Sequence, residues 1–172
     1  MRRIVLALGM LSLCGCAARV FEVPLSPPAD VSSAAEVRVH DGRLDPQVYI
    51  TVINIGATAI NLLAPNPTLD VALKSFIQDK LPPSYDGQAI SVNIERLDLK
   101  DKVGFAKADE LYCELESTLT QGDSNKQTLV RTFSKNGENL SPFIYNAAKL
   151  ILDQCLEQHA QQLVAQLEKA PE

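Results

Sequence analysis

The residues best suited to chemistry in this sequence are its four cysteines. Cys14 and Cys16 lie close together near the start of the chain, directly behind an apolar stretch, whereas Cys113 and Cys155 lie far downstream in unrelated segments. A thiol can accept a lipid, form a disulfide, attack a substrate or bind a metal ion. The residues around each cysteine decide between these uses.

Signatures of catalysis and of metal binding are missing from the sequence. It contains no Gly-x-Ser-x-Gly motif, no Gly-rich phosphate loop and only two histidines, His40 and His159, in separate segments. Ser141 precedes a proline and is better explained as a helix cap. Glu114 and Glu116 alternate along a strand and are expected on its solvated face, and His159 is expected on a helix face near solvent. We therefore predict a non-enzymatic protein that needs no metal ion and no cofactor.

The first sixteen residues, MRRIVLALGMLSLCGC, have the pattern of a secretory signal peptide. Two arginines precede an apolar stretch of about ten residues, too short for a permanent membrane span. The stretch ends in Leu13-Cys14-Gly15-Cys16, which resembles the bacterial lipobox. The resemblance implies cleavage between Gly15 and Cys16, and acylation of Cys16 with diacylglycerol and palmitate. Cys14 is the rival acceptor, although Leu13 is bulky for the position before the cut; an ordinary secretory signal is the other reading.

Acylation would attach the mature chain firmly to a membrane, because several acyl chains make a reversible association stable. Ala17 follows Cys16, and it is not the Asp that retains lipoproteins in the inner membrane in enterobacterial-type sorting. The periplasmic face of the outer membrane is therefore the expected location. The net charge is −5, from 16 Lys+Arg against 21 Asp+Glu, and basic residues do not cluster after residue 3. Nucleic acid is thus not an expected partner.

Cys113 and Cys155 are the remaining cysteines after cleavage and acylation. The bacterial periplasm is oxidising, and both residues fall at positions expected to face the core. A disulfide between them would join the last helix to the central hairpin and stabilise the fold by about 4 kcal/mol on a chain-entropy model. Two buried, unreactive thiols are the alternative.

The chain divides into four parts. Residues 1–15 are the signal peptide, 16–35 a lipid-anchored flexible tether, 36–168 a periplasmic domain and 169–172 a short tail. The tether is inferred from three prolines among serines and alanines, with no sustained hydrophobic period.

Hydrophobic periodicity predicts the elements of the domain. Alternation and β-branched residues predict strands over 47–55, 59–63, 89–99, 111–119 and 128–133, with a bulge near Glu95. Helical spacing predicts helices over 69–81 and from Ile144 to Leu167, capped by Asn66-Pro67 and Ser141-Pro142. The fold class is α+β, with two layers, a mostly antiparallel sheet and two amphipathic helices packed on one face. Tyr49 and Tyr112 are expected to share the other face.

Four segments follow the lipobox and carry a family resemblance: VYITVINIG (48–56), LDVALKSFIQDKL (69–81), VNIERLDLKDKVGFAKADELYCELEST (92–118) and TFSKNGENLSPFIYNAAKLILDQCLEQ (132–158). Together they resemble the YajG-like family of bacterial outer-membrane lipoproteins. The resemblance implies a lipid-anchored protein and brings no catalytic residues with it. The pair of downstream cysteines and the Pro82-Pro83 break depart from the family pattern.

Two functions are compatible with these features. The first is a non-enzymatic accessory or scaffold protein in envelope assembly or transport, which binds the membrane through its acyl chains and an envelope protein through its domain. A sheet edge at Gln47–Ile55 or Thr128–Phe133 could accept a strand of that partner. The alternative is a carrier or sensor of an apolar ligand, such as a lipid, held between the helices and the sheet. The sequence predicts no oligomeric state.

Overall fold

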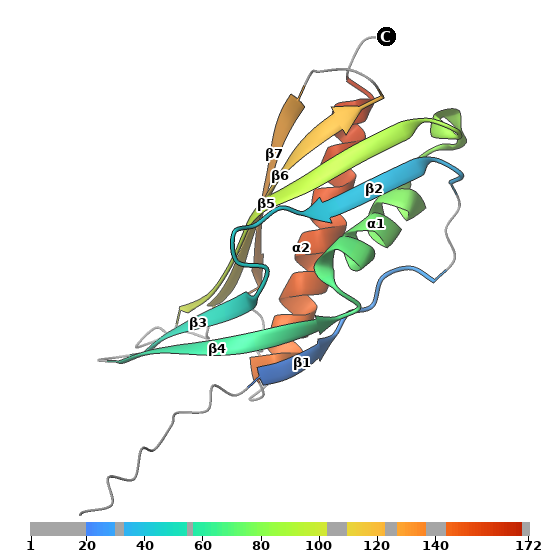
Figure 1. The fold of residues 1–172 in the computed structure, drawn as a ribbon. Coiled ribbons are helices and arrows are strands. Elements are labelled where there is room, and N and C mark those ends of the chain that lie inside the picture. The colour runs from blue at the N-terminus through green and yellow to red at the C-terminus, as the bar shows by residue number, and fades with distance from the viewer. Residues whose placement is uncertain are drawn as a thin grey trace, which may run out of the picture.

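The computed structural model describes residues 20–29, 33–54, 57–102, 110–122, 127–136 and 144–169. These residues form seven strands, two α-helices and one short 3-10 helix (Figure 1). In chain order the elements are β1 (Val20–Pro24), β2 (Glu36–Asp41), β3 (Val48–Asn54), β4 (Ala57–Asn66), α1 (Leu69–Lys80), η1 (Pro83–Tyr85), β5 (Ala89–Lys102), β6 (Glu110–Gln121), β7 (Gln127–Asn136) and α2 (Ile144–Leu167).

All seven strands belong to one mixed sheet, with the order β1-β4-β3-β5-β6-β7 and β2 paired with β5. The sheet is organised around β5, a strand of 14 residues. Along one side of β5, β2 pairs in parallel with its first half and β3 pairs in parallel with its end. Along the other side, β6 pairs antiparallel over nearly the whole length, and β7 pairs antiparallel with β6. The longest pairings are therefore antiparallel.

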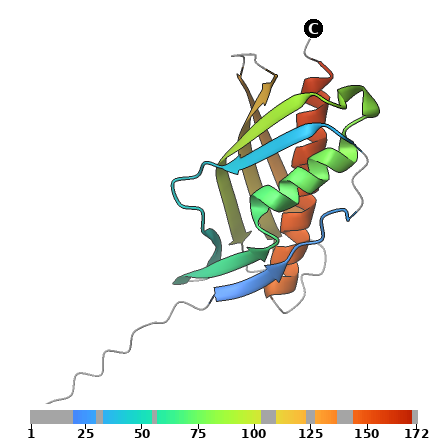
Figure 2. The same ribbon diagram turned by 45° about the vertical axis from the view of Figure 1, so that its right-hand side comes forward.

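Both helices pack on the same face of this sheet (Figures 1 and 2). The alternation of β5 and β6 turns apolar side chains toward the helices, and each helix contributes one apolar stripe. In α2 the buried stripe contains Ala148, Ile151, Leu152, Cys155, Leu156, Ala160, Leu163 and Leu167. The predicted α+β fold with two helices on one face is confirmed.

The predicted elements lie close to those of the structure. Strands occur at all five predicted places, and α1 ends before the Pro82-Pro83 break. The bulge predicted near Glu95 is present, because the pairing of β5 with β6 shifts register between Ile94 and Arg96. The predicted Ser141-Pro142 cap lies outside the described residues.

The predicted flexible tether is wrong for the part that the structure describes. β1 pairs in parallel with β4, and the side chains of Val23, Leu25 and Ala35 are buried in the core. The Ser26 N–H also donates to Asp153 Oδ1 of α2 at 2.9 Å. The folded domain therefore includes residues from Val20 onward. A strand of five residues is too short to show a period, and prolines are tolerated on an edge strand.

Two further expectations are corrected. β2 was not predicted, and it pairs with β5. β3 is an interior strand rather than the predicted sheet edge, because it pairs with β4 on one side and β5 on the other. Asn66 does not cap α1, because it is the last residue of β4 and is joined to Pro67 by a cis peptide bond. Thr68 is the N-cap residue, and its side chain makes no capping hydrogen bond.

The packing of β1 can be tested by comparing two valines of that strand. Val23 is fully buried, whereas Val20 is 57% exposed. Val23→Ala should lower the free energy of unfolding by about 2 kcal/mol, because it leaves a cavity in the core, while Val20→Ala should change it by less than about 0.5 kcal/mol. Urea unfolding followed by circular dichroism measures both. Equally small changes in the free energy of unfolding for the two variants would contradict the packing of β1 and favour a flexible tether.

Candidate functional site

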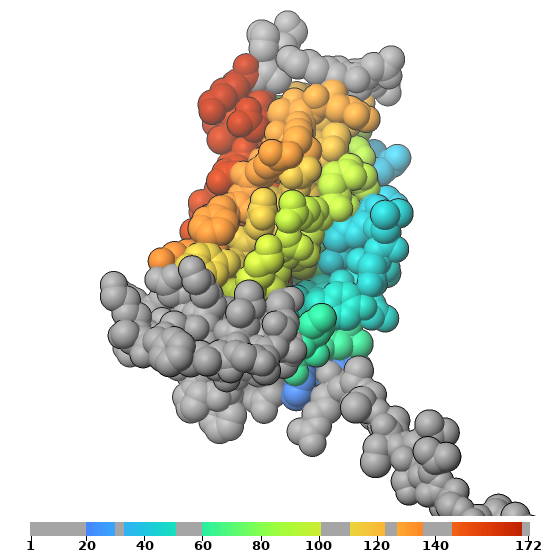
Figure 3. Space-filling model, turned by 90° about the vertical axis from the view of Figure 1, so that its left-hand side faces the viewer, coloured from blue at the N-terminus to red at the C-terminus, as the bar shows by residue number. Residues whose placement is uncertain are grey.

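Among the described elements, both helices lie on one face of the sheet and neither covers the other face (Figures 1 and 2). We call it the open face and define it by the outward side chains of β3, β5, β6 and β7: Tyr49, Arg96, Asp98, Lys100, Tyr112, Glu114, Glu116, Leu129, Arg131, Phe133 and Lys135. In Figure 3, β7, β6 and β5 lie in front, and α2 appears only beside β7. Strand alternation places these residues on one side, because every second side chain points the same way.

The middle of the open face is a mosaic of charged residues. Arg96 contacts Asp98 and lies 3.8 Å from a carboxylate oxygen of Glu114, and Lys100 lies 3.7 Å from Asp98. The hydrogen bond with Asp98 is the main cause that raises the pKa of Arg96 above its usual value. Glu114 and Glu116 therefore lie on the solvated face, as predicted. Each of the two carboxylates has a basic neighbour, Arg96 for Glu114 and Arg131 for Glu116.

The β7 side of the open face carries exposed apolar and aromatic side chains between basic ones. The ring centroids of Tyr112 and Phe133 are 5.6 Å apart, and Lys135 Nζ lies 5.6 Å from the centroid of the Tyr112 ring. Phe133 is 62% exposed and Leu129 is 52% exposed. Single exposed apolar side chains are common. Here two of them lie on the same side of β7, a strand at one end of the sheet, and one packs against a tyrosine ring at a tilt.

Tyr49 and Tyr112 share the open face, as predicted, but they do not form one aromatic platform. β5 lies between their strands. The Tyr49 hydroxyl lies 2.9 Å from Asp45 Oδ2, and this hydrogen bond is the main cause that raises the pKa of Tyr49. Tyr112 instead has its neighbours on β7, so each tyrosine has local partners of its own.

A buried polar network lies between α2 and the strands β6 and β7. His159 is fully buried, and its two ring nitrogens lie 2.7 Å from Ser117 Oγ and 2.7 Å from Thr132 Oγ1. Thr132 donates its hydroxyl hydrogen to Gln162 Oε1 at 2.8 Å, so its oxygen must accept from His159 Nδ1. His159 is then protonated at Nδ1, and Nε2 accepts from Ser117.

The expectation that His159 faces solvent is wrong. Burial lowers the pKa of His159 from 6.5 to about 4, so the ring is neutral at physiological pH. The contact of Ser117 with His159 has the atoms of a nucleophile and its base, but both side chains are fully buried and a substrate cannot reach them. The network positions β7 on α2. Its sequence signal was Ser117, a polar residue at an inward position of β6.

Cys113 and Cys155 are joined by a disulfide, and both are fully buried. The bond links β6 to α2. Of the two alternatives predicted for these cysteines, a disulfide or two buried thiols, the structure has the disulfide. The disulfide lies next to the polar network in both elements. Ser117 comes after Cys113 on β6, and His159 comes one helical turn after Cys155 on α2. The disulfide therefore supports the same strand–helix interface.

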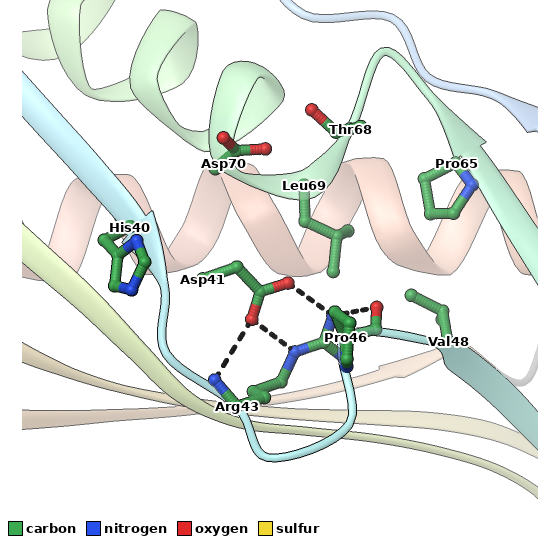
Figure 4. Close-up of a pocket in the computed structure, with 9 residues that line it drawn as sticks. All are labelled: His40, Asp41, Arg43, Pro46, Val48, Pro65, Thr68, Leu69 and Asp70. Atoms are coloured by element: carbon green, nitrogen blue, oxygen red, sulfur yellow. Dashed lines mark hydrogen bonds and ion pairs between the residues drawn. The ribbon is translucent and has the colours of Figure 1, made fainter.

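A pocket of about 300 Å³ lies between the β2–β3 connection and the start of α1 (Figure 4). Arg43, one of the residues that line it, has a side chain that is almost fully buried. Arg43 donates to both carboxylate oxygens of Asp41, at 2.7 and 2.6 Å, and to the carbonyl oxygen of Pro46 at 2.6 Å. These hydrogen bonds hold the β2–β3 connection in place, and they engage the Arg43 guanidinium with groups of the protein.

Several predicted site residues lie outside the described part of the chain. These are the cleavage position at Gly15, the lipid acceptor Cys16, its rival Cys14, and Ser141. Among the residues that are described, no three His, Cys, Asp or Glu side chains form a group suited to a metal ion. None of the described helices has the length and apolar character needed to cross a membrane.

No model of a known protein family matches this sequence, and no curated protein matches it. Among solved structures, its fold is similar to that of a Xanthomonas campestris protein assigned to the DUF330 family, with 12% identity, a TM-score of 0.50 and coverage of 88% of this chain and 99% of that chain. A minor lipoprotein from Acinetobacter baumannii shows 10% identity and a TM-score of 0.36, covering 80% of this chain and 96% of that chain. The first likeness shows a shared fold. Membership of the YajG-like family stays a prediction from the sequence.

The neutral state of His159 predicts a loss of stability in mild acid. Its pKa is about 4 when folded and 6.5 as an ordinary histidine, so the unfolded chain binds more protons between these values and stability falls as the pH drops. Between pH 7 and pH 5 the free energy of unfolding should decrease by about 2 kcal/mol through this group alone. His159→Gln should remove that part of the slope in urea unfolding. His40→Gln, at an exposed histidine, is the control; an unchanged slope in His159→Gln would contradict the assignment.

Proposed function

We propose that this chain is a lipid-anchored lipoprotein of the bacterial outer membrane, which acts without catalysis as an accessory or scaffold protein in envelope assembly or transport. The observation that carries the binding role is the open face: both helices cover one side of the sheet, and the other side ends at β7 with Tyr112, Leu129 and Phe133 exposed or half-exposed. Such an edge offers unpaired main-chain groups together with apolar area.

The anchor would hold the domain close to the lipid. β1 begins at Val20, four residues after Cys16, and four extended residues reach at most about 14 Å. β1 and β7 lie at opposite ends of the strand order. An anchor beside β1 would therefore leave the β7 edge available for a protein partner.

The alternative role, a carrier of an apolar ligand between the helices and the sheet, has no observation that favours it. The described residues in that space are closely packed core side chains, including Leu73, Ile77, Leu115 and Ile151, which are all fully buried. A second group in the same space is the polar network around His159. The pocket beside Arg43 lies at the margin of this layer, where polar side chains such as Asp41, Arg43 and Asp70 line it beside Val48 and Leu69.

The anchor is tested by separating the two neighbouring cysteines. Cys16→Ala should abolish incorporation of labelled palmitate and move the protein from the membrane fraction to the soluble periplasm, because no acyl chain then holds it. Cys14→Ala is the matched control and should keep both label and membrane association. Label retained in Cys16→Ala and lost in Cys14→Ala would assign the acceptor to Cys14.

The binding role is tested by photo-crosslinking in intact cells. Benzoylphenylalanine placed at Phe133, which is 62% exposed, should give a discrete crosslinked product. At Val71, which is 49% exposed on α1, it should give none, because only the open face is expected to meet a partner. Immunoblots of the irradiated cells show the products. Absence of a product at Phe133, or an equal product at Val71, would contradict a partner on the open face.

A further inference from the structure

β7 has one unpaired side among the described strands, since it pairs with β6 and ends the strand order. The hydrogen bonds of the sheet determine which of its residues face that side. The Gly122 N–H donates to the Ala89 carbonyl oxygen at 2.8 Å, so that level of the β5–β6 ladder is hydrogen-bonded. Hydrogen-bonded levels recur at every second residue of an antiparallel ladder. In this part of β6, even-numbered residues therefore turn their main-chain groups toward β5, and odd-numbered residues turn theirs toward β7.

This alternation carries over to β7. Ser117, an odd-numbered residue of β6, lies opposite Val130, so the even-numbered residues of β7 bond β6. Leu129, Arg131 and Phe133, which are odd-numbered, turn their N–H and C=O groups to the other side of β7, where none of the described strands pairs with it. The side chains of these three residues point outward on the open face.

The outward side chains of β7 alternate between apolar and basic, and β7 contains no acidic residue. Arg131 contacts Glu116 of β6 through Nε, at 2.5 Å, and its side chain is 65% exposed. A strand added beside β7 would place its own outward side chains directly opposite these residues. Cross-strand pairs favour apolar against apolar and acidic against basic.

The inward side of an added strand would meet α2, whose sequence contains five glutamines: Gln154, Gln158, Gln161, Gln162 and Gln166. Two of them already bond β7, since Gln158 accepts from Ser134 at 2.5 Å and Gln162 accepts from Thr132 at 2.8 Å. Gln154 and Gln166 continue the same row at spacings of four residues, and Gln161 lies beside it. Neutral amides both donate and accept, so these five residues, which we call the glutamine flank, suit uncharged polar side chains.

We infer that β7 and the glutamine flank of α2 bind an extended segment of another envelope protein, whose outward residues alternate between apolar and acidic and whose inward residues are uncharged and polar. This inference rests on the proposed function and names the chemistry of the partner. A second copy of this chain fits less well, because β7 offers no carboxylate to face Arg131 or Lys135 of its mate.

The test uses the purified full chain and a labelled, capped ten-residue peptide, TVTETVTETV, with binding followed by fluorescence anisotropy. The structure predicts saturable binding that weakens at least tenfold when lysines replace the two glutamates. Arg131→Glu should reverse that preference. Leu129→Pro removes an edge-facing N–H without breaking a bond to β6, and it should weaken binding at least tenfold relative to Leu129→Ala, which keeps the N–H.

Two copies of the peptide, N-methylated at alternate residues in opposite phases, test strand addition without changing the protein. One phase should abolish binding and the other should retain it, because only one set of N–H groups faces β7. Equal affinities of the two phases, or of the glutamate and lysine peptides, would overturn the inference. So would a dimer of the chain in light scattering that Leu129→Pro abolishes. Crosslinks at Phe133 together with failure of the peptide tests would reject the strand partner and leave the proposed function standing.

Discussion

Burial of only one face of the sheet constrains most of this structure. Because both helices lie on that face, β5 and β6 must turn an apolar side chain inward at every second residue, and the residues between them meet water. The bulge between Ile94 and Arg96 preserves this pattern along β5. It shifts the inward set so that Leu97 and Leu99 continue inward after Ile94, where strict alternation would expose them. The open face, with its charged mosaic and aromatic edge, is the other consequence of the same constraint.

The buried interface changes from apolar to polar toward β7. Next to β5 and β6 the helices pack through aliphatic side chains and the disulfide of Cys113 and Cys155. Next to β7 the contacts include hydrogen bonds of Thr132 with His159 and Gln162, beside the buried side chain of Val130. A hydrogen bond fixes relative position more strictly than an apolar contact does, since a displaced donor remains buried and unsatisfied. The edge proposed to receive a partner is therefore held in one register, and its stability depends on a neutral histidine.

Elements with several repeats of a period were predictable, because each repeat adds independent evidence for one burial face. The long stripe of α2, the hairpin of β6 and β7 and the bulge of β5 belong to this group. β1 and β2 were not predicted, because neither shows several repeats of a period. Each has only five or six residues and is stabilised by parallel pairing with a distant strand, β4 or β5. The prediction that Asn66-Pro67 caps α1 failed for a related reason, since a local capping pattern cannot show that Asn66 ends a paired strand.

Side-chain period was enough to predict the α+β class and the inward positions of Cys113 and Cys155. The signal peptide and the lipid acceptor Cys16 stay predictions from the sequence. The assembled fold was needed to show that residues from Val20 belong to the domain and that β3 is interior. It was also needed to show that His159 is buried between Ser117 and Thr132 and that β7 ends the order of the described strands. Strand order and burial arise from contacts between segments far apart in the chain, and no local period encodes them.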